Sequence, residues 1–283
     1  MANETNNFAE LVSHCKEYGY IFQSSEIYDG LAAVYDYGQM GAQLKKNIRD
    51  YWWKSMTQLH DNIVGIDAAI FMHPTTWKAS GHVDNFSDPM IDNKDSNKRY
   101  RVDHLIEGFS EELKAKGEDE KANELLAKMD QLLAATDYTA LKKLIDDNHI
   151  KCGISKTSNW TEIREFNLMF NTQIGSVAGE SDTIYLRPET AQGIFVNFLN
   201  VQKTGRMKIP FGIAQTGKAF RNEIVARQFI FRMREFEQME MQFFVKPGEE
   251  MKWYDYWKDT RLKWHLSLGL GRENYRFHDH EKL

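Results

Sequence analysis

The sequence predicts an α+β fold, in which an antiparallel sheet is flanked by helices and carries a mostly helical insertion. Three observations support this prediction. A long amphipathic pattern near the N-terminus leads into a short apolar run, a highly charged segment with regularly spaced leucines follows, and segments of strand length dominate after residue 160. Because these strands do not alternate regularly with helices, an antiparallel sheet is favoured over a parallel one.

Composition narrows the class of protein. The chain has 283 residues, of which 42% are hydrophobic, so it is long enough to bury a substantial core. A formal net charge of -5 argues against a general polyanion-binding surface but leaves room for a local basic patch. Cys15 and Cys152 form no C-x-x-C motif, so the sequence predicts neither a disulfide framework nor a cysteine zinc site. No stretch approaches the roughly 18 apolar residues of a membrane span, and we expect a cytoplasmic protein.

The first predicted element is a helix of about five turns. Its apolar residues recur at spacings of four and three, as on one helical face, and these residues are Met40, Leu44, Ile48, Trp52, Met56 and Leu59. The solvent side is expected to carry Lys45, Lys46, Arg49 and Lys54. The apolar run over 63–74 then predicts a buried central strand, or a strand at a subunit interface, that ends at Pro74.

The segment 92–159 is expected to be an inserted, mostly helical subdomain. It begins with a loop-like stretch, and dense charges of both signs then accompany leucines at helical spacing. Gly117 and the pair Thr136–Asp137 are expected to separate its helices. Taken alone, this pattern indicates a solvated helical appendage without chemistry of its own.

The following part of the chain is predicted to supply most of the sheet. Strands are expected over 162–175, 182–188 and 209–220. Pro188 suits the first position of a helix, and the apolar stripe behind it is expected to be Ile194, Phe195, Phe198 and Leu199.

The segment 220–244, FRNEIVARQFIFRMREFEQMEMQFF, carries the most informative polar pattern. With strand parity, Arg221 and Glu223 project from one face of a first strand, while a second strand presents Phe236, Gln238 and Glu240. The loop between the strands carries further arginines, which are Arg227, Arg232 and Arg234. Guanidinium groups can hold a phosphate through two parallel hydrogen bonds, so the pattern fits a nucleotide receptor.

A structural explanation of the same segment stays open. Alternating arginines and glutamates across a hairpin commonly form ion pairs on a solvated face, and phenylalanines at these spacings commonly belong to a core. Neither of the two common glycine-rich phosphate-binding motifs is present. The residues alone therefore favour the structural explanation over nucleotide binding.

FRNE followed by a loop and FRMREFEQME resembles the second signature motif of class II aminoacyl-tRNA synthetases. More narrowly, the chain resembles glycyl-tRNA synthetases of the homodimeric kind. The motifs that match that family in order are YGYIFQSSEIYDGLAAVYDYG, IDAAIFMHP, ASGH, YRVDHLIE, SKTSNWTEIREFNLMF, RPETAQGIFVNF and PFGIAQTGKAFRNE. The resemblance covers essentially the whole chain. It implies a class II catalytic domain over 1–283, incomplete at its C-terminus, with the insertion over 92–159 inside it.

The resemblance also implies an activity and its residues. The family activates glycine with ATP and transfers it to tRNA(Gly), with Mg²⁺ as a cofactor. Arg221 is the implied catalytic residue, which holds the α-phosphate and the glycine carboxylate. The implied ATP-binding residues are Arg221, Asn222, Glu223, Phe231, Arg232 and Phe236. Among these, Glu223 would read the adenine amino group, Arg232 would reach the outer phosphates and Phe236 would stack on adenine. The implied glycine-binding residues are Arg101, Glu189, Gln238 and Glu240.

For Glu189 a second explanation remains, because a glutamate in the first turn of a helix is favoured by the helix dipole. The resemblance further implies a homodimer, with the segment that ends at Pro74 as its interface. The alternative function is a non-catalytic, synthetase-derived module that binds a nucleotide or a partner.

The chain departs from the family pattern at several places. A Gly-Pro-Leu-Gly turn is replaced by Gly38-Gln39-Met40-Gly41, and Val225-Ala226 stands where a proline is common. The segment DNKDSNKRY, which leads into YRVD, contains no cysteine, so no zinc is expected there. The chain ends at HDHEKL, before a third motif, and we expect an N-terminal portion of a longer enzyme. The late segment LGLGRENYR is expected to be the glycine cap of a preceding helix.

Overall fold

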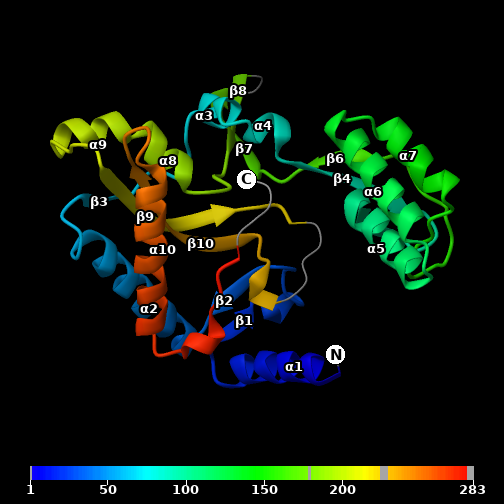
Figure 1. Cartoon of the computed structure of the whole chain (residues 1–283), viewed down its shortest axis with the longest axis horizontal. Coiled ribbons are helices and arrows are strands. Elements are labelled where there is room, and N and C mark those ends of the chain that lie inside the picture. Colours follow the sequence, from blue (N-terminus) through cyan, green and yellow to red (C-terminus); the bar gives the residue numbers. More distant parts are fainter. Residues whose placement is uncertain (1, 178–179, 224–228, 279–283) are drawn as a thin grey trace. The chain divides into compact units, whose positions relative to one another are not determined.

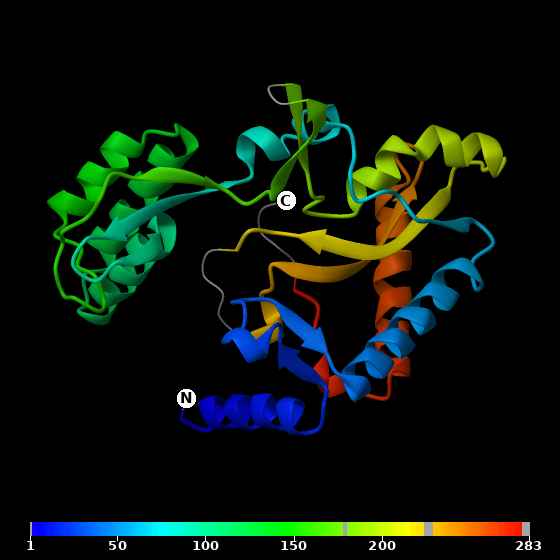
Figure 2. The same cartoon turned by 180° about the vertical axis from the view of Figure 1, so that it is seen from behind.

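The computed structural model describes residues 2–177, 180–223 and 229–278. The chain divides into two compact units (Figures 1 and 2). Unit 1 comprises Met1–Met72, Glu189–Phe220 and Glu235–Leu283, and unit 2 comprises His73–Pro188 and Arg221–Arg234. Both units combine helices with strands that pair mainly in antiparallel fashion, which confirms the predicted α+β fold class.

Unit 1 contains helices around a three-stranded sheet. Its N-terminal elements are α1 (Ala2–Glu17), β1 (Ile21–Gln23), η1 (Glu26–Tyr28), β2 (Tyr35–Tyr37), α2 (Gln39–Thr57) and β3 (Ile63–Ile66). Its later elements are α8 (Ala191–Val196), α9 (Phe198–Thr204), β9 (Phe211–Phe220), β10 (Glu235–Phe244), α10 (Glu250–Ser267) and η3 (Arg272–Asn274). In the sheet, β9 lies between its antiparallel partner β10 and its parallel partner β3.

The long predicted helix is confirmed as α2, but only part of its apolar stripe is buried. Trp52 and Met56 pack with Ile63 in the core of unit 1. In contrast, Met40 is 51% exposed and Leu44 is 50% exposed. Leu59 was wrongly placed on the helix, since α2 ends at Thr57. The C-terminal half of the stripe therefore faces the core, while the N-terminal half faces outward.

The basic side of α2 is less solvated than expected, because it binds β10. Lys45 Nζ lies 2.6 Å from Glu237 Oε2, and Arg49 Nη1 lies 3.1 Å from Glu237 Oε1. Burial alone would raise the pKa of Glu237, but the hydrogen bonds from Lys45 and Arg49 lower it below its usual value. A carboxylate held by two cations on a half-buried surface ties the helix to the strand.

Two glycines allow the N-terminus of α2 to approach the preceding segment. Gly38 N donates to Tyr20 O at 3.0 Å, and Met40 N donates to Gly19 O at 3.1 Å. A Cβ atom at Gly38 would lie 2.4 Å from Gly19 O, and one at Gly41 would lie 1.9 Å from Tyr20 O. The Gly38-Gln39-Met40-Gly41 segment therefore has a packing role that needs glycine at both ends.

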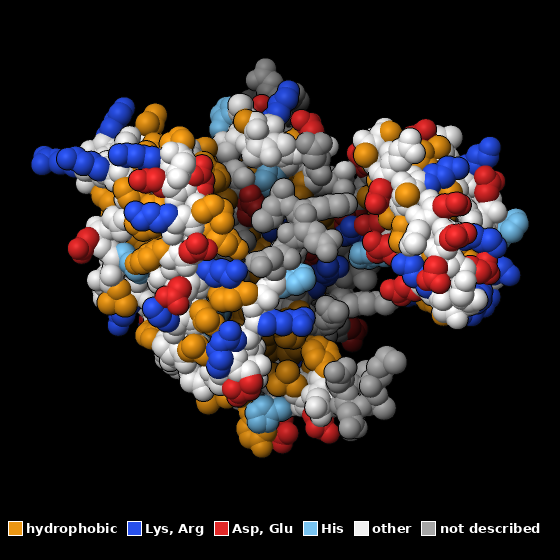
Figure 3. Space-filling model, viewed as in Figure 1, with side chains coloured by type: hydrophobic (Ala, Val, Ile, Leu, Met, Phe, Trp, Pro, Cys, Tyr) orange, Lys and Arg blue, Asp and Glu red, His pale blue; other side chains and the backbone are white. Residues whose placement is uncertain are grey.

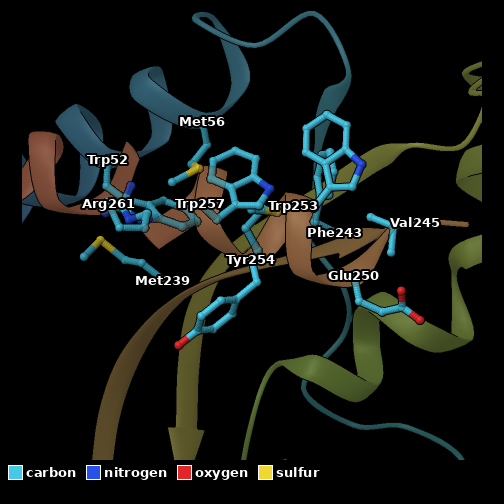
Figure 4. Close-up of a pocket in the computed structure, with 11 residues that line it drawn as sticks. Trp52, Met56, Met239, Phe243, Val245, Glu250, Trp253, Tyr254, Trp257 and Arg261 are labelled. Atoms are coloured by element: carbon cyan, nitrogen blue, oxygen red, sulfur yellow. The ribbon is translucent and has the colours of Figure 1, made fainter. Parts of the chain in front are cut away.

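An aromatic groove of about 540 Å³ lies in unit 1 between α2, β10 and α10 (Figure 4). Trp52 comes from α2, Phe243 from β10, and Trp253 and Trp257 from α10. Burial lowers the pKa of Arg261 in this groove to about 10. Since alternate strand residues point to opposite faces, Phe243 lies on the face of β10 opposite to Gln238 and Glu240. The groove is therefore separate from those two candidate site residues.

Unit 2 contains small sheets and three longer helices. Its first elements are α3 (Pro74–Ala79), α4 (His82–Asn85), β4 (Ser87–Asn93), β5 (Lys98–Arg101), α5 (Val102–Ala115), α6 (Asp119–Ala134) and α7 (Tyr138–Asp147). The elements that follow are β6 (Arg164–Asn167), β7 (Asn171–Val177), β8 (Glu180–Tyr185) and η2 (Phe229–Phe231). Strand β4 pairs antiparallel with both β5 and β6, and β7 pairs antiparallel with β8. As predicted, Gly117 and Thr136–Asp137 lie between helices.

The core of unit 2 explains why its charged sequence still folds. Ile106 of α5 and Leu141 of α7 are completely buried, and they join Ile150 and Trp160 in one cluster. Trp160 Nε1 donates to Ile150 O at 2.8 Å, so the indole ring is packed in the core and its N–H has a hydrogen-bond partner. The leucines at helical spacing therefore face a common interior, and the charges remain outside.

The expected strand over 63–74 is shorter in the structure. β3 covers only Ile63–Ile66, and Pro74 begins helix α3 rather than ending a strand. Pro74 fits there because a proline needs no hydrogen-bond partner at the first helical position. The expected glycine cap is confirmed, since α10 ends at Ser267 and Gly269 adopts a positive φ of 88°. Among the described residues, no helix is both long enough and apolar enough to cross a bilayer.

Candidate functional site

One face of the hairpin β9–β10 presents three of the predicted site residues. Phe236 pairs with Ala219, Gln238 pairs with Gly217, and Glu240 pairs with Gln215. Directly paired residues of antiparallel strands project to the same side. The predicted parity of Phe236, Gln238 and Glu240 is therefore confirmed. Gly217 has no side chain, which leaves room in front of Gln238.

Thr190 connects two of these residues to the start of α8. Its side chain is completely buried. Thr190 N donates to Gln238 Oε1 at 3.1 Å, and the Thr190 hydroxyl donates to Glu240 Oε2. Gln242 Nε2 donates to the other carboxylate oxygen of Glu240 at 2.7 Å. Thr190, Gln238, Glu240 and Gln242 therefore form one hydrogen-bonded group in unit 1, and Glu189 directly precedes it in the chain.

The helix that was expected to begin at Pro188 begins at Ala191 instead. The prediction was wrong because the segment before the helix is held by β10 through the two hydrogen bonds of Thr190. Glu189 consequently lies ahead of the helix rather than in its first turn. The helix-dipole explanation for Glu189 loses its basis, and its role in binding glycine stays a prediction.

Gln215 is a polar residue that the sequence analysis did not single out. It is completely buried in β9, and neither of its amide atoms has a hydrogen-bond partner among the described residues. A Cβ atom at Gly193 would lie 3.3 Å from Gln215 Oε1, so the glycine makes room for the amide. The alternation of side chains along a strand could have identified Gln215, because the residues on the same face of β9 include the apolar Phe211, Ile213 and Ala219. Polar groups buried in this way usually bind ordered water.

We expect Thr190→Val to lower the free energy of unfolding by about 1–3 kcal/mol, because valine keeps the volume but leaves a carboxylate oxygen of the half-buried Glu240 without its donor. Urea unfolding of the two chains in parallel measures the difference. Thr190→Ser is the matched control, since it keeps the hydroxyl. Equal losses in both variants would show that the threonine methyl, and not the hydrogen bond, provides the stability.

Arg221 lies in unit 2, immediately after the end of β9. Its Nε donates to Pro188 O at 3.1 Å, and its guanidinium lies over the ring of Phe86 at 5.6 Å from the ring centre. Asn222 N donates to Leu168 O at 2.7 Å, which draws the backbone out of the sheet. The expectation that Arg221 and Glu223 project from the first strand was therefore wrong, since β9 ends at Phe220.

Glu223 is close to two arginines in the described part of the following loop. Arg234 Nε donates to the backbone oxygen of Glu223 at 3.1 Å, and Arg232 Nε lies 3.9 Å from Glu223 Oε2. Phe231 belongs to η2 and is 72% exposed. Arg227 and the pair Val225-Ala226 lie outside the described residues. The structure thus brings Arg221, Asn222, Glu223 and Arg232 together within unit 2.

Arg101 forms a separate charged cluster in unit 2. Its Nη1 lies 3.2 Å from Asp88 Oδ1, and its Nη2 lies 2.5 Å from Asp103 Oδ2. Burial raises the pKa of Asp88 above its usual value. Asp103 differs, because hydrogen bonds from Arg101 and the backbone of His104 outweigh its burial and lower its pKa. The sequence analysis missed both partners, Asp88 on the neighbouring strand β4 and Asp103 only two residues after Arg101.

Comparisons with known proteins agree on one family. A model described as "Glycyl-tRNA synthetase insertion domain 1" matches residues 88–124 and 116–168, and one described as "tRNA synthetase class II core domain (G, H, P, S and T)" matches residues 172–277. A glycine–tRNA ligase of Chlorobaculum tepidum is 51% identical over 97% of this chain and 59% of its own length. A glycine–tRNA ligase of Staphylococcus aureus is 52% identical over 96% of this chain and 56% of its own length. The chain thus spans little more than half the length of these curated relatives.

A solved structure has a more distant similarity. It is described as the RNA-binding domain of threonyl-tRNA synthetase from Cryptosporidium parvum, and it is 15% identical, with a TM-score of 0.47. The match covers 88% of this chain and 40% of that chain.

Proposed function

The chain belongs to the glycyl-tRNA synthetases within class II of the aminoacyl-tRNA synthetases, and from this premise we propose that it carries ATP- and glycine-binding residues of a glycine–tRNA ligase. The observation that carries the proposal is the polar face of β10, where Gln238 and Glu240 are fixed by Thr190. The proposed reaction joins glycine to ATP as glycyl-adenylate and then transfers glycine to tRNA(Gly).

In the first step, an oxygen of the glycine carboxylate attacks the α-phosphorus of ATP and pyrophosphate leaves. We assign Arg221 to the α-phosphate and the glycine carboxylate, because Pro188 O and the ring of Phe86 hold its guanidinium in place. A fixed cation stabilises developing negative charge without reorganising during the reaction. We assign Glu223 and Phe236 to the adenine base. We assign Asn222 and Phe231 to ATP binding without specifying the part of ATP that they contact.

Arg232 is assigned to the outer phosphates of ATP. Its 3.9 Å separation from Glu223 is a loose ion pair, which leaves the guanidinium able to exchange a carboxylate for a phosphate. Mg²⁺ commonly takes only one or two protein carboxylates and completes its shell with substrate phosphates. Within the described part of the chain, no group of three or more His, Cys, Asp or Glu side chains could hold a metal ion. We therefore propose that Mg²⁺ binds mainly through ATP, where it supplies charge neutralisation for pyrophosphate.

The glycine ammonium group is assigned to carboxylates of the site. Glu240 is half-buried and already accepts two hydrogen bonds, so its carboxylate is fixed in orientation. Glu189 beside Thr190 supplies a second carboxylate, and Gln238 lies on the same strand face as Glu240. Arg101 of unit 2 remains assigned to glycine binding. A substrate without a side chain can be selected only if space for a methyl group is absent, so fixed walls are needed.

We also propose that the protein forms a homodimer in the cytoplasm. The exposed N-terminal half of the α2 stripe supports the dimer, since Met40 and Leu44 are each about half exposed. Exposed apolar side chains in a row on one helix are typical of an interface. Sedimentation of this chain at several concentrations tests the dimer, and a monomer at all of them would contradict it.

The test of the function is glycine-dependent ATP–pyrophosphate exchange on this chain, with alanine and serine as controls. Exchange that only glycine supports is the expected result. ATP binding without any exchange would favour the alternative, a synthetase-derived nucleotide-binding module. Absence of both exchange and ATP binding would contradict the assignment of the β9–β10 hairpin and its loop.

A further inference from the structure

Unit 2 contains a basic hollow that shares only Arg101 with the residues assigned to the proposed reaction. The hollow has a volume of about 630 Å³ and lies along α5, β5 and the segment 149–156. Its lining includes four lysines, which are Lys98, Lys116, Lys151 and Lys156, and two histidines, His104 and His149. Glu112 is the only carboxylate among its described lining residues. This local excess of cations contrasts with the net charge of -5 for the whole chain.

The lysines differ from the arginines in the same lining. Arg99 is neutralised by Asp92, with Nε 2.7 Å from Oδ1, and Arg101 is neutralised by Asp88 and Asp103. No ion pair is described for any of the four lysines, although Lys116 contributes, after Lys121, to lowering the pKa of Glu118. Elsewhere on unit 2, acidic and basic side chains are intermixed, as Figure 3 shows for the face of α5–α7 turned to the viewer. The lining of the hollow therefore has a local excess of positive charge.

The floor of the hollow is apolar and partly open. Leu105 and Phe109 of α5 lie beside Gly108, and a Cβ atom at Gly108 would meet nothing within 4 Å. Across the hollow, His149 follows α7 with a positive φ of 50°. The hydrogen bonds His149 N to Asp146 O and Ile150 N to Ile145 O show that His149 occupies the helix-ending position where glycine is favoured. Gly108 therefore leaves open a space that a longer side chain would fill. His149 adopts a positive φ that glycine would adopt with less strain.

We propose that this hollow binds a phosphate-bearing ligand of mononucleotide size, at a site separate from the ATP-binding residues on the β9–β10 hairpin and its loop. The lysines and histidines would hold the phosphates, and the apolar floor with Phe109 would hold a planar base. A volume of about 630 Å³ falls within the range of small-molecule sites. The cations surround one hollow, which fits a compact polyanion better than the extended backbone of a nucleic acid. Arg101 is the one described residue shared with the glycine-binding set.

The test is titration of this chain with a fluorescent ATP analogue, with pyrophosphate as competitor. We expect two binding events, which weaken as salt increases. The double variant Lys116→Glu/Lys151→Glu should weaken one event by about 100-fold or more, because it removes two cations and adds two anions. Arg221→Ala should weaken only the other event. Failure of the two proposals is therefore distinguishable.

Two controls separate specific binding from general effects. Lys128→Glu/Lys143→Glu changes the charge of unit 2 equally at exposed positions outside the lining and should leave both events intact. Gly108→Leu should abolish the hollow event without any change in charge, since leucine is compatible with the helix and projects into the hollow. The proposal is wrong if both ATP-binding events survive in the Lys116/Lys151 variant. It is also wrong if these lysines are needed for binding of single-stranded RNA but not for binding of any nucleotide.

Discussion

Glycine-dependent ATP–pyrophosphate exchange should fall by about 100- to 1000-fold in Arg221→Ala, which is the range for removing one preorganised group that stabilises developing charge. The physical reason is the fixed position of the guanidinium, whose Nε is bound to Pro188 O while its plane lies over Phe86. Affinity for ATP should weaken as well, because the α-phosphate loses a charged hydrogen bond. Exchange is measured with glycine and ATP varied separately.

Arg221→Lys is the matched control. Lysine keeps the charge but cannot make the Nε bond to Pro188 O or place two parallel donors on a phosphate. We expect it to recover only a small part of the exchange rate. A lysine variant as active as the parent chain would mean that charge alone suffices, and an alanine variant with unchanged exchange would remove Arg221 from the mechanism.

Gly41→Ala should destabilise unit 1 by about 3 kcal/mol, even though alanine is the better helix former by up to about 1 kcal/mol. An added Cβ atom would lie 1.9 Å from Tyr20 O and 2.8 Å from Tyr20 C, so the backbone before α2 would have to move. Urea unfolding followed by tryptophan fluorescence reports mainly on unit 1, which holds Trp52, Trp53, Trp253, Trp257 and Trp264, whereas unit 2 holds Trp77 and Trp160.

The control for this variant is Gly108→Ala, also in the interior of a helix. A Cβ atom at Gly108 meets nothing within 4 Å, so only the gain in helix propensity remains and unit 2 should become slightly more stable. Opposite signs for the two glycine variants are the expected result. Stabilisation in both would show that Tyr20 does not approach α2 as closely in solution.

Elements with a strong local period were predictable from the sequence. The spacing of Trp52 and Met56 identified α2, and the parity of Gln238 and Glu240 placed them on one strand face. These patterns are properties of a few consecutive residues, which the printed sequence contains in full. The order of the helices in the insertion followed for the same reason, because Gly117 and Thr136–Asp137 interrupt the pattern locally.

Features decided by partners distant in sequence were not predictable. The start of α8 moved from Pro188 to Ala191 because Thr190 is bound by β10, about fifty residues later. The face of α2 with Lys45 was expected to be solvated, but Glu237 supplies a carboxylate there. The resemblance named Arg101 but gave no indication of its partner Asp88, which lies on the paired strand β4.

The division of the chain into two units also affects which segments can be exchanged between related proteins. The chain passes between the two units after Met72, Pro188, Phe220 and Arg234. The short segment 221–234 is therefore anchored by residues encoded far upstream, through Leu168 O to Asn222 N and Pro188 O to Arg221. Exchanging only the stretch 73–188 between relatives would keep these main-chain acceptors. The side chain under the Arg221 guanidinium, Phe86, would then come from a different parent than Arg221 itself.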